Sequence, residues 1–504
     1  MKNLKIYFTS DLHGYVYPTN YIDKKEKAMG LLNIINFYNK DGNTLIIDAG
    51  DTIQGSPFTY YLSGNEFDIH PMATIMNHGG YDYVTLGNHD FNYGLDYLGK
   101  YLNNLNGKCI CANVHDKNNK LPIIPYDIKT LENGLKVGLL GLTTDFITKW
   151  ERPEHIEGLE ISNTFEAVKK YFNEVKSKCD ILVGVYHGGF EYDLNSHTQL
   201  TFTSENIAYK LCKEFDFDIL LTGHQHTNIP GHYIHNTYIA QTPNNGRNFL
   251  ELKLELNDDG NKNISSSLIP LTINPEKEMY NKFLPLENEV QNWLDTDVGF
   301  LDNPLYPKDY LEMALNGSYL ANFINQIQLE QSGADISCTS FANSIKGFNK
   351  NVTVRDIMST YMYPNTLVIL EVDRENLKLA LERCASYFDI ANNEIKISED
   401  FLKPKVTHYN YDYFSNIKYT FDLNRPVGDR VTSILFNNKE LDENTRLNLV
   451  MNNYRATGAG GYEFYEDCKR VREILVEMPE VIINYFKNNR NVTVDKNKYI
   501  NIIK

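Results

Sequence analysis

The sequence predicts an α/β protein built from two domains joined by a helix. In the first half, short apolar strands alternate with amphipathic stretches, which is typical of an α/β sandwich. A polar stretch with helical spacing follows, and a second mixed α/β segment fills the rest of the chain. At 504 residues the chain also exceeds the size at which one hydrophobic core stops growing.

The elements of the first half are short apolar runs separated by glycine or polar residues. The predicted strands are Lys5–Phe8, Thr44–Ile47, Tyr83–Leu86, Val137–Leu142, Ile181–Tyr186 and Asp218–Leu221. Two helices are expected, one where Leu31, Leu32, Ile35 and Tyr38 recur at helical spacing and one near Thr164–Val175.

Polar side chains follow five of these strands, at the point where each strand ends. In an open α/β sheet the carboxyl ends of the strands form the edge at which ligands bind. One such residue alone is usually a helix cap, a buried histidine or a polar turn. Their recurrence at five strand ends indicates one shared site, whose residues are Asp11, His13, Asp51, Asn88, His89, His187, His224 and His226.

This donor set predicts a metal site. Carboxylate and amide oxygens combined with imidazoles, without a thiolate, suit Mn, Fe, Zn or Co. The ligands are too many for one tetrahedral ion, so two divalent metal ions that share a carboxylate are expected. Such a pair can hold the attacking and leaving oxygens of an in-line displacement and generate hydroxide near neutral pH.

Charge and composition exclude several other classes of function. The formal net charge of −16 argues against a general nucleic-acid-binding face, so an anionic substrate needs local positive charge, which metal ions supply. No apolar run is long enough to span a membrane, and no apolar signal core precedes the first strand. We therefore expect a cytoplasmic protein. A monomer is expected, although no sequence feature determines the oligomeric state. The seven cysteines lack zinc-ribbon spacing and are expected to be free thiols.

Five motifs in the first half, taken in order, resemble those of calcineurin-type metallophosphoesterases. They are Asp11-x-His13, Gly50-Asp51, Gly87-Asn88-His89-Asp90, Gly184-Val185-Tyr186-His187 and Gly223-His224-Gln225-His226. The resemblance implies a four-layer α/β/β/α sandwich over residues 1–275. It also implies a role for each residue. Asp11, His13 and His226 would bind one metal, and Asn88, His187 and His224 the other. Asp51 would bridge the two metals, and His89 would contact the phosphoryl group without binding metal.

The second half is expected to begin with a linking segment, residues 276–310, and to continue as a separate domain, residues 311–504. Apolar residues recur every three to four positions from Met279 to Trp293, which predicts the linking helix. Beyond it we expect a long helix near Leu311–Ser332, a strand Thr366–Val372 and a helix Arg374–Tyr387. A glycine-dense loop flanked by tyrosines, residues 452–462, is weak evidence of phosphate binding by itself.

A metallophosphoesterase domain followed by this loop resembles the 5′-nucleotidase family, and the resemblance covers nearly the whole chain. It implies a nucleotide-recognition domain of α/β (α+β) type, in which two aromatic side chains stack on the nucleobase. Tyr454, which precedes the glycine-dense loop, is the first. The second is Tyr409 or Tyr411, in the aromatic cluster that precedes Tyr419. Stacking suits any base, so a broad range of nucleotides is expected.

Two departures from the 5′-specific pattern indicate a branch of that family. Residues 339–346 lack the arginine expected there, and we take Asn343 of this stretch as a further substrate contact. Asn92 stands three residues after His89, where an aspartate is usual. Three other stretches, Gly87–Asp96 with Asn92, Gln54-Gly55-Ser56-Pro57 and Asn453-Tyr454-Arg455-Ala456, instead resemble the 2′,3′-cyclic-nucleotide 2′-phosphodiesterase/3′-nucleotidase branch.

The predicted reaction is attack on phosphorus by a metal-bridging hydroxide. Phosphoryl transfer depends mainly on positioning and on charge neutralisation. His89, when protonated, is expected to stabilise the developing charge or the leaving oxygen, and either Asn92 or Asp90 orients it. The alternatives are a 5′-nucleotidase or nucleotide-sugar hydrolase, a phosphoesterase acting on protein or DNA, and a nucleotide-sensing protein without turnover.

Overall fold

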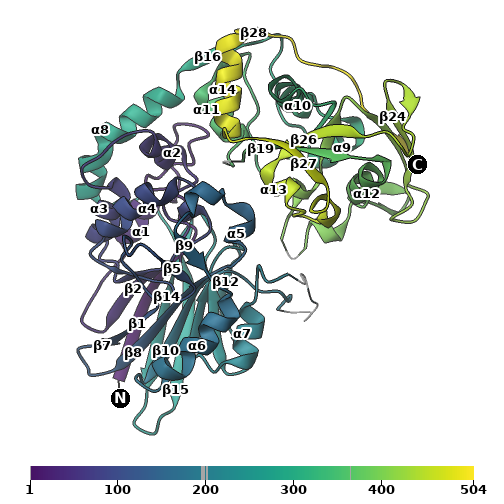
Figure 1. Cartoon of the computed structure of the whole chain (residues 1–504). Coiled ribbons are helices and arrows are strands. Elements are labelled where there is room, and N and C mark those ends of the chain that lie inside the picture. The colour runs from purple at the N-terminus through teal and green to yellow at the C-terminus, as the bar shows by residue number, and fades with distance from the viewer. Residues whose placement is uncertain (1, 195–198, 200–202, 364, 404) are drawn as a thin grey trace. The chain divides into compact units, whose positions relative to one another are not determined.

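The computed structural model describes residues 2–194, 199, 203–363, 365–403 and 405–504 (Figure 1). The chain forms two compact units, Met1–Val290 and Gln291–Lys504. Helix α8 (Lys277–Leu294) lies where one unit ends and the other begins, and it contains Pro285. No helix in the described part of the chain combines the length and the apolar character needed to cross a membrane.

The first unit is built on two sheets that both contain parallel strands. In the first sheet the order is β15 (Lys262–Pro270), β14 (Asn248–Leu256), β1 (Lys2–Thr9), β2 (Thr44–Asp48), β3 (Tyr83–Val84), β4 (Lys108–Ile110) and β6 (Ile123–Ile124). In the second it is β12 (Ile229–Ile234), β13 (Thr237–Gln241), β11 (Ile219–Thr222), β10 (Ile181–His187), β8 (Lys136–Thr143) and β7 (Tyr126–Thr130). Strands β1, β2 and β3 are parallel neighbours, as are β8, β10 and β11.

The two sheets pack face to face, and helices cover their outer faces. Phe8, Ile47, Val183 and Leu221 belong to one buried cluster, so strands of both sheets supply the core between them. Leu182 packs in a second cluster with residues of α6 (Thr164–Lys176) and α7 (Ala208–Glu214). Helices α1 (Leu31–Ile35), α3 (Pro71–His78) and α4 (Gly94–Asn103) lie on the side of the first sheet (Figure 1). The four-layer α/β/β/α arrangement expected from the sequence is confirmed.

The remaining elements of the first unit are short and lie in the connections. Two antiparallel strands, β5 (Val114–Asp116) and β9 (Leu159–Ile161), form a separate ladder. The short helices are α2 (Pro57–Ser63), α5 (Ile147–Trp150), η1 (His89–Phe91) and η2 (Pro153–His155). Of these, η1 and α5 carry residues of the candidate site described below.

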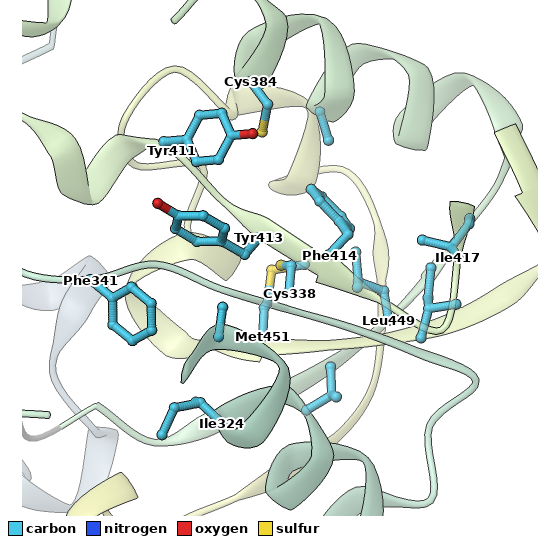
Figure 2. Packing of buried hydrophobic residues seen from close by; sticks show 14 of the residues in the cluster. Ile324, Cys338, Phe341, Cys384, Tyr411, Tyr413, Phe414, Ile417, Leu449 and Met451 are labelled. Atoms are coloured by element: carbon cyan, nitrogen blue, oxygen red, sulfur yellow. The ribbon is translucent and has the colours of Figure 1, made fainter. Parts of the chain in front are cut away.

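The second unit is mixed α/β around one extended core. Its largest sheet has the order β22 (Tyr413–Ser415), β17 (Ile336–Thr339), β26 (Leu447–Asn452), β19 (Leu367–Val372) and β27 (Lys469–Ile474). A four-stranded sheet has the order β25 (Lys439–Glu440), β24 (Val431–Phe436), β23 (Lys418–Asp422) and β29 (Ile500–Ile503). A three-stranded sheet has the order β18 (Asn351–Thr353), β16 (Asp297–Leu301) and β28 (Asn491–Val492). Strand β20 (Phe388–Ala391) pairs with β21 (Glu394–Ile397). Its helices include α10 (Tyr319–Ser332), α11 (Val354–Thr360), α12 (Arg374–Ala385), α13 (Asn453–Ala456) and α14 (Met478–Asn488). Figure 2 shows part of the core, where Ile324 of α10, Cys338 of β17 and Met451 of β26 meet.

One predicted element of the second unit is wrong. The expected continuous helix near Leu311–Ser332 is two helices, α9 (Tyr310–Asn316) and α10, separated by Gly317 and Ser318. Gly317 adopts a positive φ of 79°, which ends α9, and the Ser318 hydroxyl accepts a hydrogen bond from the backbone N–H of Ala321 and begins α10. The apolar periodicity continues across this break, because both helices pack against the same core.

Candidate metal centre

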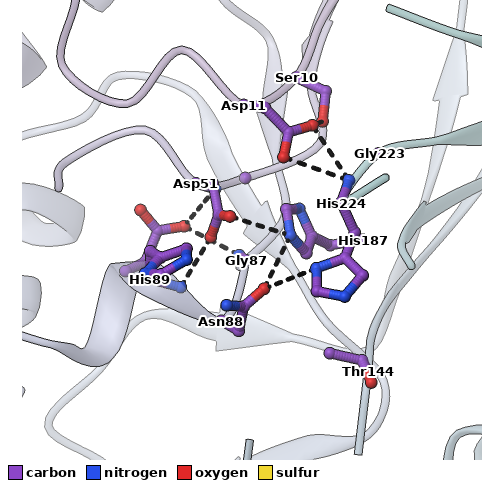
Figure 3. Close-up of polar contacts among 12 residues, drawn as sticks. Ser10, Asp11, Asp51, Gly87, Asn88, His89, Thr144, His187, Gly223 and His224 are labelled. Carbon is purple, nitrogen blue, oxygen red and sulfur yellow. Dashed lines mark hydrogen bonds and ion pairs between the residues drawn. The ribbon is translucent and has the colours of Figure 1, made fainter. Parts of the chain in front are cut away.

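Both sheets bring polar residues to the same edge. Asp11 follows β1, Asp51 follows β2, and Asn88 with His89 follow β3. From the second sheet, His187 is the last residue of β10, and His224 and His226 follow β11. Figure 3 shows Asp11, Asp51, Asn88, His187 and His224 converging on one point. The structure therefore brings together every residue that the sequence predicts at the strand ends.

The backbone of this site is held in an uncommon conformation. Asp11, His13, Asp51, His224 and His226 all have positive φ, between 48° and 71°. Among the described residues nine other non-glycine residues do so, and seven of those are asparagines, which tolerate this region best. Such strain costs about 1–3 kcal/mol per residue and is concentrated at functional sites.

Asp11, His13 and His226 form the first cluster. The Nε2 atom of His226 lies 3.2 Å from Asp11 Oδ1 and 3.2 Å from His13 Nε2. His13 Nδ1 donates to the Gln54 carbonyl at 3.0 Å, so the lone pair of this neutral ring is on Nε2, facing the cluster. Ring nitrogens and a carboxylate oxygen that meet in this way fit a shared cation.

Asn88, His187 and His224 form the second cluster. Asn88 Oδ1 lies 3.2 Å from His187 Nε2 and 2.9 Å from His224 Nδ1. The opposite nitrogen of each ring has an acceptor, since His187 Nδ1 donates to the Ala49 carbonyl at 2.7 Å and His224 Nε2 to Glu205 Oε1 at 3.0 Å. These contacts direct the other nitrogen of each ring, His187 Nε2 and His224 Nδ1, towards Asn88, where it could bind a metal once it is free of a proton.

Asp51 lies between the two clusters. Its Oδ2 atom is 3.2 Å from His187 Nε2 and 3.9 Å from His13 Nε2, and the carboxyl group is buried. A carboxylate in this position fits the role of a bridge between two cations. Asp11 is also close to both clusters, since it forms a second possible metal-binding group with Asp51 and His187.

The electrostatics of these side chains also favour a cation. Burial opposes a positive charge on His187, but the Asp51 carboxylate beside it prevails and raises the pKa of His187 to about 10. Burial raises the pKa of Asp51, yet His187 and His89 together hold it well below its usual value. At His13 burial prevails and lowers the pKa to about 4. A proton on His187 therefore compensates part of the carboxylate charge when no metal is bound.

Metal binding is expected to release this proton. A coordinated imidazole is neutral, so a cation that takes His187 Nε2 must displace a proton from a group whose pKa is about 10. Near pH 8 we expect about one proton per protein from this residue, and an affinity for Mn²⁺ that rises with pH up to about 10. Calorimetry of the metal-free protein in two buffers of different ionisation enthalpy measures this release. Binding without proton release would contradict the assignment of His187.

His89 lies beside the candidate metal ligands and has its own hydrogen-bond partner. Its ring is 5.4 Å from that of His13, centroid to centroid, and its backbone N–H donates to Asp51 Oδ1 at 2.7 Å. His89 Nδ1 lies 2.8 Å from Asn92 Oδ1, so Asn92 rather than Asp90 orients the ring. The Asp90 carboxylate instead accepts from the backbone N–H groups of residues 51, 52, 53 and 87.

The residues predicted to contact the base lie in the second unit and differ in exposure. Tyr409 lines a pocket with Phe341, Tyr361 and Tyr363, and Tyr454 on α13 is half-buried. Tyr411 is buried in the core, and its hydroxyl donates to the Ala314 carbonyl at 3.1 Å (Figure 2). The ring of Tyr411 therefore has no face open to a nucleobase in this structure.

Asn343 is exposed, but its amide is engaged within the second unit. Its Nδ2 atom donates to the Val406 carbonyl at 2.7 Å, and its Oδ1 accepts from the His408 backbone N–H at 3.0 Å. The structure thus gives Asn343 a role in holding the segment that leads to Tyr409. Lys346, at the end of the same stretch, pairs with Asp356 at 2.8 Å.

Sequence patterns alone miss the outer partners of this site. Glu205, which accepts from His224, and Glu151, which accepts from Asn92 at 2.6 Å, stand in no recognisable motif. Each comes from a loop distant in sequence from the residue that it contacts.

Comparison with known proteins agrees with both halves of the structure. Residues 4–228 match the calcineurin-like phosphoesterase family, and residues 298–467 match the C-terminal domain of 5′-nucleotidases. The crystal structure of a Staphylococcus aureus protein, provisionally named a 5′-nucleotidase and bound to α-ketoglutarate, is 34% identical in sequence, with a TM-score of 0.92 and full coverage of both chains. The chain belongs to the 5′-nucleotidase family of calcineurin-like metallophosphoesterases. It is therefore a hydrolase with a divalent metal centre.

Two relatives of this 5′-nucleotidase family member have names that refer to nucleotides. The 2′,3′-cyclic-nucleotide 2′-phosphodiesterase/3′-nucleotidase of Salmonella typhimurium is 26% identical over 90% of this chain and 81% of its own length. The trifunctional nucleotide phosphoesterase YfkN of Bacillus subtilis is 24% identical over 97% of this chain, which spans 38% of YfkN.

Proposed function

We propose that this chain hydrolyses phosphate esters of nucleotides at a dinuclear metal centre, and that it prefers 2′,3′-cyclic nucleotides and 3′-nucleotides. The position of Asp51 carries the proposal of two metals, because its carboxylate lies between His13 of one ligand cluster and His187 of the other. Asp11, His13 and His226 would hold one ion, and Asn88, His187 and His224 the other. Residues 1–275, 276–310 and 311–504 are the proposed catalytic domain, linker and substrate-binding domain.

The metal ions would supply the positive charge that phosphoryl transfer requires. The chain itself positions the proton donor. With Nδ1–H of His89 donated to Asn92 Oδ1, the second nitrogen, Nε2, is left to contact the phosphoryl group or the leaving ribose oxygen. A proton on that Nε2 would pass to the leaving oxygen as its bond to phosphorus breaks.

For the base we propose stacking by Tyr454 and Tyr409. Arg455, next to Tyr454, is buried and pairs with Asp412 at 2.9 Å. Its Nη2 also donates to the backbone carbonyl of Tyr409 at 2.8 Å, and its Nη1 to that of Ala459 in the glycine-dense loop. This arginine therefore fixes the two tyrosine-bearing segments to each other. Because Tyr411 is buried, Tyr409 is the partner that we propose.

Replacing Tyr454 by alanine tests the role in base stacking. Loss of one aromatic–base contact costs about 1–3 kcal/mol, so kcat/KM for 3′-AMP should fall about ten- to a hundredfold. Turnover of p-nitrophenyl phosphate, which has no base, should hardly change. Tyr319→Ala, at an exposed tyrosine of the same unit, is the matched control. Equal losses on both substrates with a lower Tm would show that Tyr454 only packs the domain.

Substrate preference is tested by phosphate release from 3′-AMP, 5′-AMP, 2′,3′-cyclic AMP and UDP-glucose with added Mn²⁺. We expect the cyclic nucleotide and 3′-AMP to be the better substrates. The observation that favours this over 5′-nucleotidase activity is the stretch 339–346, which lacks an arginine and whose Lys346 is already paired with Asp356. Faster release from 5′-AMP or UDP-glucose would contradict the preference. No release from any substrate would favour a nucleotide-sensing protein.

A further inference from the structure

The hydrogen-bonded chain behind His89 extends two residues beyond Asn92. Asn92 Nδ2 donates to Glu151 Oε2 at 2.6 Å. The other carboxylate oxygen of Glu151 lies 2.8 Å from His155 Nδ1 and accepts from the Arg152 backbone N–H at 2.8 Å. The Glu151 side chain is only 5% exposed. A buried acidic group is thus connected to the proposed proton donor through one amide.

We propose that Glu151 is a positioning residue, which fixes the amide of Asn92 and thereby the ring of His89. The proposal rests on the role of His89 stated above. A carboxylate only accepts hydrogen bonds, whereas an amide has a donating and an accepting end. With its NH₂ group directed to Glu151, Asn92 must present its oxygen to His89 Nδ1, which keeps a proton on Nδ1. Nε2 is then the nitrogen that is available to the substrate.

Glu151 is well placed for this task because its own position is fixed from two sides. It follows helix α5, whose last residue, Trp150, stacks on His224 with ring centroids 5.7 Å apart and planes 22° apart. His155, one turn further along, contacts the oxygen that does not bind Asn92. The segment 150–155 therefore contacts a proposed metal ligand at one end and anchors the carboxylate at the other.

Asn92, unlike an aspartate at the same position, needs a hydrogen-bond acceptor such as Glu151 to fix the orientation of its side chain. A carboxylate at position 92 would accept from His89 with either oxygen, whereas an amide that rotates by 180° would place its NH₂ group against Nδ1–H. An acceptor-only partner such as Glu151 removes that second orientation. Glu151 and Asn92 together would thus supply the orientation that a single aspartate supplies elsewhere.

Glu151→Gln tests this directly. A glutamine both donates and accepts, so it no longer selects one orientation of the Asn92 amide. We expect kcat for 3′-AMP to fall about ten- to a hundredfold, with KM and the metal content unchanged. Glu154→Gln, at an exposed glutamate of the same segment, should match the wild type. A kcat of Glu151→Gln equal to that of wild type would overturn the proposal.

Exchanging the two groups separates positioning from packing. In the double variant Asn92→Asp/Glu151→Gln, the new carboxylate at position 92 faces His89. The new amide at position 151 donates a hydrogen bond to that carboxylate. We expect kcat about tenfold above that of Glu151→Gln, because the acceptor for Nδ1–H is restored. Asn92→Asp alone places two carboxylates in contact and should be slower than the double variant. If Glu151→Gln fails to fold, the comparison of the double variant with Asn92→Asp decides instead.

A double variant no faster than the single ones would overturn the proposal, since a residue that only packs would not show this rescue. His89→Asn separates this result from failure of the proposed function. If His89→Asn keeps its turnover, both proposals are wrong. If it loses turnover while Glu151→Gln does not, only the role of Glu151 is wrong.

Discussion

Asp51→Asn is expected to lower kcat by about a thousandfold while the protein remains folded. The substitution replaces the buried carboxylate between His13 and His187 by a neutral amide of nearly the same shape. It removes the negative charge that would hold two cations together, and it leaves His187 without the carboxylate that contributes most to raising its pKa. The Asp51 Oδ1 atom also accepts from the His89 backbone N–H, so the proposed proton donor is disturbed as well.

The measurement is kcat for 3′-AMP with Mn²⁺ in excess, together with metal content and Tm. Asp41→Asn, at an exposed aspartate just before β2, is the matched control and should keep wild-type turnover. Metal content in Asp51→Asn is expected to fall, since both sites lose a ligand. Near-wild-type turnover with full metal content would show that Asp51 does not bridge two ions.

The proposed metal ligands could be picked out from the sequence because each lies at or just after the carboxyl end of a buried strand. The apolar runs of β1, β2, β10 and β11 specify strands, and parallel pairing brings their carboxyl ends to one edge. The residue types at those ends then indicate the chemistry. What the sequence did not indicate was the strained conformation of Asp11, Asp51 and His224, which depends on the surrounding loops.

The partners of His89 and His224 were not predictable for a physical reason. Glu151 is 59 residues from Asn92, and Glu205 is 19 residues from His224, so only the tertiary fold brings them together. The choice between Asn92 and Asp90 was equally open, because either can reach His89 in a tight turn. It is decided by the backbone N–H groups of the loop after β2, which engage the Asp90 carboxylate.

In the second unit, the sequence did not indicate which of two nearby tyrosines is buried and which is accessible. Tyr409 and Tyr411 are two residues apart and equally plausible as stacking residues from sequence. Tyr409 lies in the short helix η4 (His408–Asn410) and lines a pocket, whereas Tyr411 packs against Tyr387 and Tyr413 in the core. Burial of one tyrosine anchors the segment that presents the other.

His89→Asn should lower kcat by about a hundred- to ten-thousandfold without loss of metal. The imidazole belongs to neither ligand cluster, and its contact with Asp51 is made by the backbone N–H, which the substitution retains. What is lost is the ring nitrogen Nε2, the only group of this residue that can deliver a proton to the leaving oxygen. KM should change little, because the proposed base contacts and metal ligands are untouched. The test is to measure both kcat and the metal content of His89→Asn. His115→Asn, at an exposed histidine, is the control. Loss of one metal equivalent in His89→Asn would instead make His89 a ligand.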